Sequence, residues 1–291
     1  EIHKIEERLC GLDLAKPVDM SEVDSFSMFY HEDTYKEIIN LREFLRHHRT
    51  DVDRFIELIA ISRLHGHSDG FFSVYSFPQI SVPREAQQRI NRQRNQVPEY
   101  RPVLPRILRK ARQALSSGLI SEIREAARHN LLTTEDVRNM KSIPTEQVQL
   151  IVTSPPFLNK ADYLADNWLE LWFIGVEIEE LRGKVIQTPH LSEWKKFMKD
   201  AIAEMARVLR PGGYCVIEVG EVVAGGQSVN LDEVIIDIAY QLFRENRCHL
   251  MPLEVLINLQ RFTKLAHCFN VTNNEKGTNT NRLVVLHKRP A

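Results

Sequence analysis

The apolar positions of this chain follow two different periods. Through residues 34–48 and 51–64 they recur every three or four positions, which predicts two amphipathic helices. Asp33 and Thr50 stand just before these stretches, and both side chains are good helix N-caps. Later in the chain the apolar residues form short continuous runs instead, and such runs predict buried strands.

The predicted strands in the second half of the chain are 149–152, 214–219, 254–258 and 283–287, with helices over 194–209 and 231–243 between the first three. Two consecutive prolines lack the backbone N–H that a sheet ladder needs, so the first strand must stop at Ser154, before Pro155 and Pro156. A hydroxyl group and proline-pinned carbonyls are thereby held at a strand terminus, where open α/β sheets bind their ligands.

Composition narrows the class of protein only a little. A chain of 291 residues with 43% hydrophobic residues can form one sizeable domain with an insertion. Its net charge of −1 does not indicate nucleic-acid binding as a whole, so any nucleic-acid footprint must be local. The four cysteines are widely spaced, which argues against a zinc site and a disulfide framework. No apolar run approaches ~20 residues and no signal peptide opens the sequence, so we expect a cytoplasmic protein that binds neither metal nor membrane.

A local excess of positive charge lies between residues 84 and 128. Arginine predominates there, and arginine is the residue that phosphate and guanine contacts prefer. The competing account is a solvated helix face. We favour nucleic-acid contact, and the candidate residues are Arg84, Arg89, Arg92, Arg94 and Arg101.

The stretch that ends the first predicted strand also carries a family resemblance. Thr153-Ser154-Pro155-Pro156-Phe157 resembles the Ser/Asp/Asn-Pro-Pro-Tyr/Phe catalytic motif of S-adenosylmethionine-dependent methyltransferases that modify exocyclic amines of DNA bases. The Thr-Ser-Pro-Pro form looks most like the cytosine-N4 branch of that family. The residues that follow, through the predicted helix at 167–173, look like the segment after the motif in these enzymes.

A second signature supports the same resemblance. Arg210-Pro211-Gly212-Gly213 stands between the predicted helix 194–209 and the predicted strand 214–219. A helix, an Arg-Pro-Gly-Gly stop and a buried strand resemble the entry to the fifth strand of the class I methyltransferase fold. The resemblance covers residues 34–288.

The segment 130–140 resembles the third-strand motif of the family, in which an acidic residue closes a strand. The resemblance places Asp136, with Glu135 as the alternative, beside the adenine of the cofactor S-adenosyl-L-methionine. Thr153 is assigned to the same cofactor site. From the residues alone, Asp136 would be no more than the start of a turn.

The resemblance implies an α/β class I methyltransferase (Rossmann-like) sheet with a helical, basic insertion. Residues 1–128 would form the helical region and candidate nucleic-acid-recognition insertion, and residues 129–291 the C-terminal part of the catalytic domain with strands three to seven. No F-x-G-x-G turn follows an apolar strand, although such a turn holds the cofactor's methionine end in this fold. We therefore expect strands one and two and the Gly-rich loop upstream of Glu1 or on a partner chain.

The implied reaction is direct methyl transfer to an exocyclic base amine, most simply cytosine N4, in double-stranded DNA with a flipped target base. Ser154 Oγ and the Pro155 carbonyl would accept the amine's hydrogens, and Phe157 would stack on the flipped base. No cysteine nucleophile is needed. Two alternatives stay open: adenine-N6 DNA or RNA base methylation, and a non-catalytic nucleic-acid-binding module with a methylase-like fold.

Overall fold

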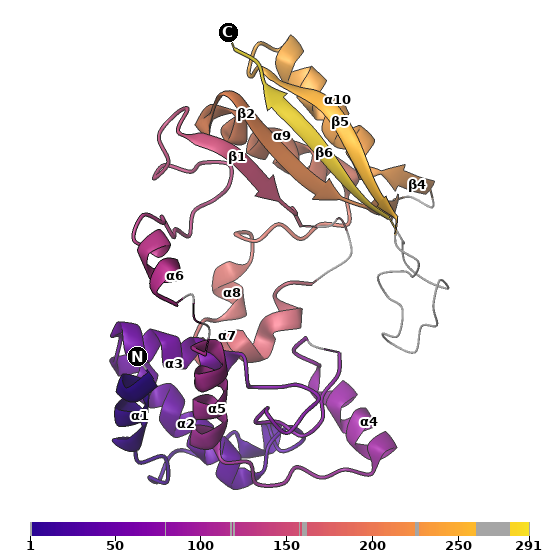
Figure 1. The fold of residues 1–291 in the computed structure, drawn as a ribbon. Coiled ribbons are helices and arrows are strands. Elements are labelled where there is room, and N and C mark those ends of the chain that lie inside the picture. The colour runs from indigo at the N-terminus through magenta and orange to yellow at the C-terminus, as the bar shows by residue number, and fades with distance from the viewer. Residues whose placement is uncertain are drawn as a thin grey trace. The chain divides into compact units, whose positions relative to one another are not determined.

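The computed structural model describes residues 2–78, 80–116, 118, 120–156, 158, 162–224, 227–259 and 280–290. The chain forms two compact units (Figure 1). The helical unit comprises Glu1–Asn130 and Leu164–Leu181, and the sheet unit comprises Leu131–Tyr163 and Arg182–Ala291. No helix in the described part of the chain is long and apolar enough to cross a membrane.

The helical unit contains α1 (Ile2–Cys10), α2 (Glu32–His47), α3 (Asp51–Ile61), α4 (Arg84–Arg94), α5 (Val103–Ala114), α6 (Ile120–Ala127), α7 (Trp168–Ile174) and α8 (Ile178–Leu181), with short 3-10 turns η1 (Val23–Ser25) and η2 (Ala165–Asn167). Its core is aromatic and aliphatic, with Phe29 and Ile38 fully buried. Leu169 and Phe173 of α7 are buried in the same core. Residues 164–181, which follow the proline motif, therefore pack with the helical unit. From the sequence we expected them in the catalytic domain, residues 129–291.

A buried polar cluster fastens α7 to the helical unit. His65 Nε2 lies 2.7 Å from Oε1 of Glu170, and the Ser81 hydroxyl donates to the other carboxylate oxygen. The same Ser81 oxygen accepts a hydrogen bond from the Leu169 N–H at 3.1 Å. Burial raises the pKa of Glu170, but the hydrogen bonds from His65 and Ser81 outweigh burial and lower the pKa below its usual value. This histidine is therefore part of a structural cluster.

Side-chain caps set the starts of α2 and α3. Thr50 caps α3 as predicted, in a capping box with Asp53. The expected cap of α2 at Asp33 is wrong, because the helix begins two residues earlier and His31 accepts the hydrogen bond from the Asp33 N–H. Asp53 is completely buried and also accepts a hydrogen bond from Arg8 Nε at 2.7 Å, which ties α1 to α3.

The sheet unit is built on four strands in the order β1-β2-β6-β5: β1 (Val148–Thr153), β2 (Leu209–Val219), β6 (Thr280–Lys288) and β5 (Leu250–Leu259). β1 and β2 run parallel, and β6 is antiparallel to both of its neighbours. β3 (Glu221–Ala224) and β4 (Gln227–Asn230) form a separate two-stranded ribbon. The fold class is therefore α/β with a mixed sheet, as expected.

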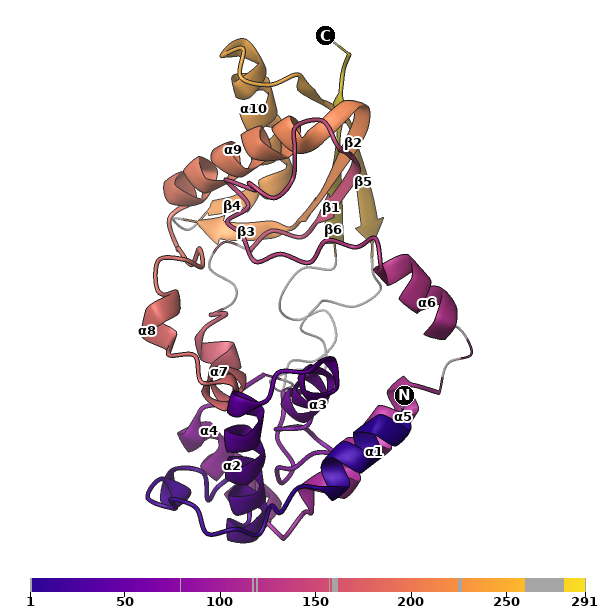
Figure 2. The same ribbon diagram turned by 90° about the vertical axis from the view of Figure 1, so that its left-hand side faces the viewer.

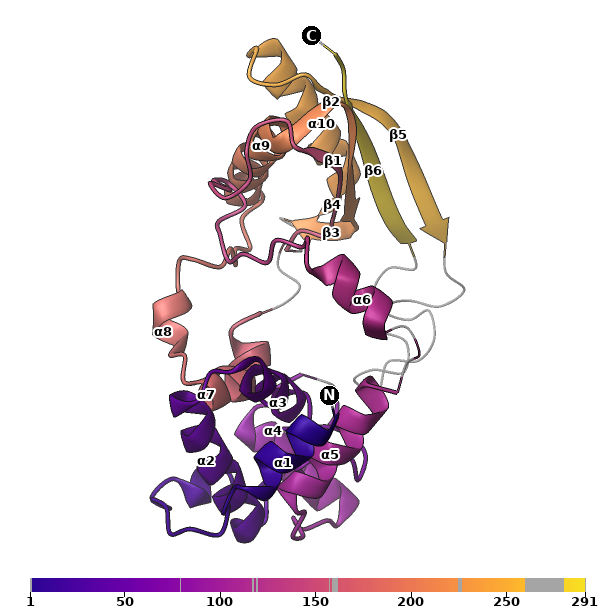
Figure 3. The ribbon, with the colours of Figure 1, turned by 60° about the vertical axis from the view of Figure 1, so that its left-hand side comes forward.

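Two long helices cover one face of this sheet (Figures 2 and 3). α9 (Leu191–Val208) and α10 (Leu231–Arg244) pack on it with their apolar residues, and Cys215 and Ile217 of β2 point into that core. On the opposite face, described side chains of the sheet are exposed, among them Leu150 at 56% and Val152 at 70%. We expected β1 to be a buried strand. For the described residues this is wrong, because the side chains on the face away from α9 and α10 are exposed to solvent.

The expected third strand over residues 130–140 is also wrong. This segment has no strand, and its backbone turns at Asp136, whose carboxylate accepts a hydrogen bond from the Arg138 N–H at 2.9 Å. A local Asx-type hydrogen bond of this kind competes with sheet pairing. Among the described strands, β1 is therefore the edge of the sheet and pairs only with β2.

The Gly-Gly pair of the second signature allows β2 to approach β1 closely. Gly212 has φ of +77°, and a Cβ on Gly213 would lie 2.8 Å from the Gln149 carbonyl oxygen of the neighbouring chain segment. Both positions therefore require glycine, the first for its backbone conformation and the second for space. The residues predicted to be a helix stop form the irregular start of β2 itself.

Replacing Asp53 with asparagine should destabilise the helical unit in a pH-dependent manner. Burial raises the pKa of Asp53, but hydrogen bonds from Arg8 and Thr50 lower it from 3.8 to about 2. A carboxylate with a lowered pKa stabilises the fold above pH 3.8 and loses that contribution as the pH falls toward 2. We expect Asp53→Asn to lower the free energy of unfolding by about 2 kcal/mol at pH 7 and by much less near pH 2.

Urea unfolding followed by tryptophan fluorescence in a Trp194→Phe background would report only on Trp168 and Trp172, which both lie in the helical unit. Asp51→Asn is the matched control, because Asp51 is an exposed acid in the first turn of the same helix. Equal losses for the two variants, or a loss for Asp53→Asn that does not shrink at low pH, would contradict this account.

Candidate active site

The proline motif lies at the carboxyl end of two parallel strands. Thr153 is the last residue of β1 and pairs with Ile217 of β2, so both strands end at the same edge of the sheet. The predicted strand end is confirmed. Beyond it Ser154 is exposed and Pro155 is buried. No described residue hydrogen-bonds to the Ser154 hydroxyl or to the Pro155 carbonyl, which leaves two oxygen acceptors available to a ligand.

A tryptophan on α9 holds the backbone of this motif in place. Trp194 is 1% exposed, and its indole N–H donates to the Pro156 carbonyl at 2.9 Å. Leu158, two residues further on, is 2% exposed and packs in the same core. The backbone is thus anchored on both sides of position 157, while Ser154 stays at the surface. Phe157, the expected stacking residue, lies outside the described residues.

An ion cluster fixes the neighbouring part of the same sheet edge. Arg282 pairs in the ladder with Val219, and its Nη2 lies 2.7 Å from Glu221 and its Nη1 3.2 Å from Asp232. Burial lowers the pKa of Arg282, but the two carboxylates outweigh burial and raise it. Residues 221–224 form strand β3 beside this cluster. The cluster ties that strand to β6 and to the start of α10.

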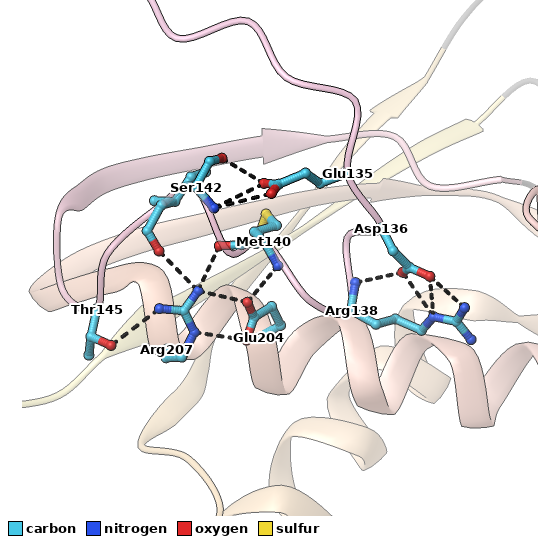
Figure 4. Close-up of polar contacts among 9 residues, drawn as sticks. Glu135, Asp136, Arg138, Met140, Ser142, Thr145, Glu204 and Arg207 are labelled. Carbon is cyan, nitrogen blue, oxygen red and sulfur yellow. Dashed lines mark hydrogen bonds and ion pairs between the residues drawn. The ribbon is translucent and has the colours of Figure 1, made fainter.

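The two candidate cofactor carboxylates are engaged within their own segment (Figure 4). Asp136 lies 2.6 Å from Nη2 of Arg138, and the hydrogen bonds from Arg138 lower the pKa of Asp136. Glu135 accepts a hydrogen bond from the Ser142 hydroxyl at 2.6 Å. Both carboxylates are exposed and hydrogen-bonded within residues 135–142, and their cofactor role stays a prediction.

One arginine of α9, Arg207, holds residues 135–145 against this helix. Arg207 donates to the carbonyls of Met140 and Ile143, each at 3.0 Å, and pairs with Glu204 at 2.7 Å. Glu204 in turn accepts a hydrogen bond from the Met140 N–H at 2.7 Å (Figure 4). This network holds residues 135–145, which have no regular secondary structure, against α9.

The structure separates the five candidate nucleic-acid arginines into three groups. Arg101 is 7% exposed and donates to the carbonyl oxygens of Ser73 and Ser68, so its proposed contact with nucleic acid is wrong. The reason is that the turn-rich loop at residues 66–76 leaves carbonyls without ladder partners, and a buried guanidinium supplies their donors.

Two of the remaining arginines lie over aromatic rings. Arg84 stacks over Trp168 with 4.5 Å from Cζ to the ring centroid, and Arg94 lies over Tyr75 at 3.8 Å. Arg89 and Arg92 are exposed on α4, and among the described residues their guanidinium groups have no partner. These two are the arginines of the set that can contact a phosphate without losing a structural contact.

Of the described cysteines, Cys215 lies nearest the motif in the sheet and is unsuited to act as a thiolate. Cys215 is fully buried in β2 with its Sγ 3.9 Å from the Met205 Sδ, and burial raises the pKa of its thiol to about 12. In the part of the chain that the structure describes, no three His, Cys, Asp or Glu residues gather as metal ligands.

Comparisons with known proteins leave the family open. No protein-family model matches the chain, and no curated protein matches it. Three crystal structures of a candidate DNA modification methylase from Thermus thermophilus are similar, with 21%, 19% and 21% sequence identity and TM-scores of 0.31, 0.32 and 0.33. The third of these contains S-adenosyl-L-methionine.

Each match covers 54% of this chain and 51%, 53% and 55% of the Thermus protein, so the chain spans about half the length of the proteins it matches. At these scores the likeness carries no weight of its own. The structure of the chain alone therefore defines its class. It is an α/β protein with a mixed sheet, in which one parallel strand ends at two prolines, and it has a second, helical unit.

Replacing Trp194 with phenylalanine should loosen the proline motif. The ring still fills the core, but the Pro156 carbonyl loses its donor, and leaving such a group unsatisfied costs about 1 to 2 kcal/mol. Hydrogen exchange of the peptide spanning β1 and the two prolines should become faster. Trp172→Phe, in the other unit, is the control and should leave that peptide unchanged. Unchanged exchange in Trp194→Phe would show that the indole does not anchor the motif.

Proposed function

We propose that this chain is the base-binding part of an S-adenosylmethionine-dependent methyltransferase that modifies an exocyclic amine of a DNA base. The observation that carries the proposal is the position of Ser154-Pro155-Pro156 at the carboxyl end of β1, with Ser154 exposed and its hydroxyl free of described partners. Parallel strands of α/β sheets present their ligand sites at this end. The order β1-β2-β6-β5, with β6 antiparallel, is also the arrangement of the class I methyltransferase fold on this side of its sheet.

The chemistry of the target explains why two oxygen acceptors are needed. The lone pair of an exocyclic amine is delocalised into the ring, so the nitrogen is a poor nucleophile until its hydrogens are drawn out of the ring plane. The Ser154 hydroxyl and the Pro155 carbonyl would accept these hydrogens and favour the tetrahedral nitrogen. Trp194 acts on this step indirectly, because its hydrogen bond to Pro156 fixes the adjoining peptide.

Target-base specificity is the finer part of the proposal. Serine at the first position of the motif favours cytosine N4, whereas the same site geometry also suits adenine N6 in DNA or an amine of an RNA base. A flipped base would stack on Phe157. Competition between duplex DNA and structured RNA in a methyl-transfer assay separates these substrates.

We propose that most of the cofactor-binding part of the site comes from residues other than Glu135 and Asp136. S-adenosyl-L-methionine supplies an electrophilic methyl group on its sulfonium, but in this chain Glu135 and Asp136 are hydrogen-bonded within residues 135–142, and the described residues form no glycine-rich cradle. We propose that the strands carrying the Gly-rich loop, upstream in the polypeptide or on a partner chain, pair with β1. The support is that, among the described strands, β1 has no partner on its outer edge and carries the exposed residues Leu150 and Val152, a combination that proteins normally cover.

A second candidate function is a nucleic-acid-binding module without catalysis. The engaged state of Glu135 and Asp136 favours it, because these were the carboxylates assigned to the cofactor. Binding of S-adenosyl-L-methionine by the intact protein, with any partner chain present, distinguishes the two. Absence of such binding, together with retained DNA binding, would favour the module.

Removing the serine hydroxyl should abolish catalysis. We expect Ser154→Ala in the intact enzyme to reduce methyl transfer to DNA by about a hundredfold or more, since preorganised acceptors of this kind contribute on that order. Phe157→Ala should abolish transfer as well. DNA binding should be largely intact in both variants. Ser192→Ala, an exposed serine at the start of α9, is the matched control. Turnover like that of the wild type in Ser154→Ala would refute the assignment.

Arg89 and Arg92 should make phosphate contacts with DNA. We expect Arg89→Ala combined with Arg92→Ala to weaken duplex binding irrespective of sequence and to reduce the slope of log affinity against log salt by about two. Fluorescence anisotropy over a salt series measures both quantities. Arg112→Ala serves as a control, because Arg112 is paired with Glu6 at 2.6 Å. An unchanged salt slope in the double variant would remove α4 from the DNA interface.

A further inference from the structure

The helical unit contains a pocket that none of the preceding chemistry uses. It has a volume of about 650 Å³ and is lined by Arg63, Ser68, Asp69, Gly70, Arg106, Arg109, Lys110 and Gln113. Arg63 follows the end of α3, the serine, aspartate and glycine belong to the loop at 66–76, and the other four residues lie on α5. α3 and α5 pack against each other and bring these segments together (Figure 1).

The pocket concentrates positive charge without a matching negative charge. Burial and the charge of Arg109 lower the pKa of Arg63, and burial, Arg101 and Arg109 lower the pKa of Arg106. Both shifts report the cost of holding cations close together away from water. The one acidic lining residue, Asp69, has a 93% exposed side chain and faces Arg101 at 3.8 Å.

Three other arginines of the same unit have carboxylate partners. Arg8 pairs with Asp53, Arg49 with Glu57 and Arg112 with Glu6, at 2.7, 2.8 and 2.6 Å. In contrast, none of the four cations of the pocket forms an ion pair with a carboxylate in the described ranges. Lys110 donates only to the neutral amide of Gln113, at 3.3 Å. The pocket thus gathers four cations that have no carboxylate partner among the described residues.

The guanidinium groups are held in place by contacts that leave donors free. Arg63 lies over the Phe71 ring at 4.2 Å, and its buried Nε has no partner. Arg106 uses its Nε and Nη1 for the carbonyls of Asp69 and Pro102, both at 2.9 Å. Arg109 is exposed and makes no described side-chain hydrogen bond. Stacking and carbonyl contacts thus orient the cations toward a shared space.

Gly70 keeps that space open. A Cβ at this position would lie 3.3 Å from Nη2 of Arg109 and 3.7 Å from Nη1 of Arg63. Any atom placed there is within reach of two guanidinium groups at once, and such a position suits the oxygen of an anion. A side chain at residue 70 would occupy it.

We propose that this pocket binds a phosphate group, held by Arg63, Arg109 and Lys110 over Gly70. Phosphate matches the planar fork of arginine and the point charge of lysine better than a single carboxylate does. Three cations can balance the single charge of a backbone phosphodiester or the double charge of a free phosphate. The group comes either from a nucleic-acid backbone or from a free phosphate compound. The site does not depend on methyl transfer and stands if that function is wrong.

Two substitutions test the site without disturbing the core. Arg109→Ala removes an exposed cation that makes no described structural contact, and Gly70→Asp places a carboxylate where we expect the ligand. Arg54→Ala is the matched control, because it removes an exposed arginine from α3 outside the pocket. The probes are inorganic phosphate, titrated at constant ionic strength against chloride, and a short DNA duplex.

We expect inorganic phosphate to bind the wild-type protein and Arg54→Ala with the same affinity. Its affinity for Arg109→Ala should be about tenfold lower, and Gly70→Asp should not bind it at all. If the ligand is a backbone phosphate, Arg109→Ala also weakens duplex binding and lowers its salt slope by about one. If the ligand is free, duplex binding stays the same while phosphate binding falls. The proposal is overturned if neither probe distinguishes Arg109→Ala from Arg54→Ala.

Discussion

The absence of a backbone N–H in two successive residues governs the candidate site. Pro155 and Pro156 cannot extend the ladder between β1 and β2, so the chain must leave the sheet after Ser154. Because the two strands are parallel, it leaves at the edge where α/β sheets hold ligands. The Trp194 hydrogen bond and the burial of Leu158 then fix the path of the departing chain, and this path leaves Ser154 at the surface.

In the part of the chain that the structure describes, helices cover the sheet on one face only. α9 and α10 cover one face, whereas the other face and the outer edge of β1 leave apolar side chains and backbone groups open to solvent. Our proposal assigns a different ligand to each part of the protein. The sheet unit of this chain binds the base, the strands that pair with β1 bind the cofactor, and the positively charged residues of the helical unit bind phosphate groups. The arginine pocket between α3 and α5 would add a fixed anion site to that unit.

The sequence predicts those features that depend on neighbouring residues. The strand end at Ser154, the Thr50 cap of α3 and the α/β alternation are all local, and all are present. The contacts that fix the site are not local. Trp194 reaches a carbonyl 38 positions away, and nothing in the sequence pattern marks that pairing. From its sequence context Arg101 is predicted to lie at the surface, whereas the fold surrounds it with loop carbonyls. The predicted third strand does not form, because the Asp136 carboxylate accepts the hydrogen bond of the Arg138 N–H locally.

The most direct measurement of the central claim is a structure of the intact protein bound to DNA with its target base flipped. The account predicts that Ser154 Oγ and the Pro155 carbonyl oxygen both lie within hydrogen-bonding distance, about 2.7 to 3.2 Å, of the exocyclic amine nitrogen. A base amine bound elsewhere, or one turned away from both oxygens, would contradict it.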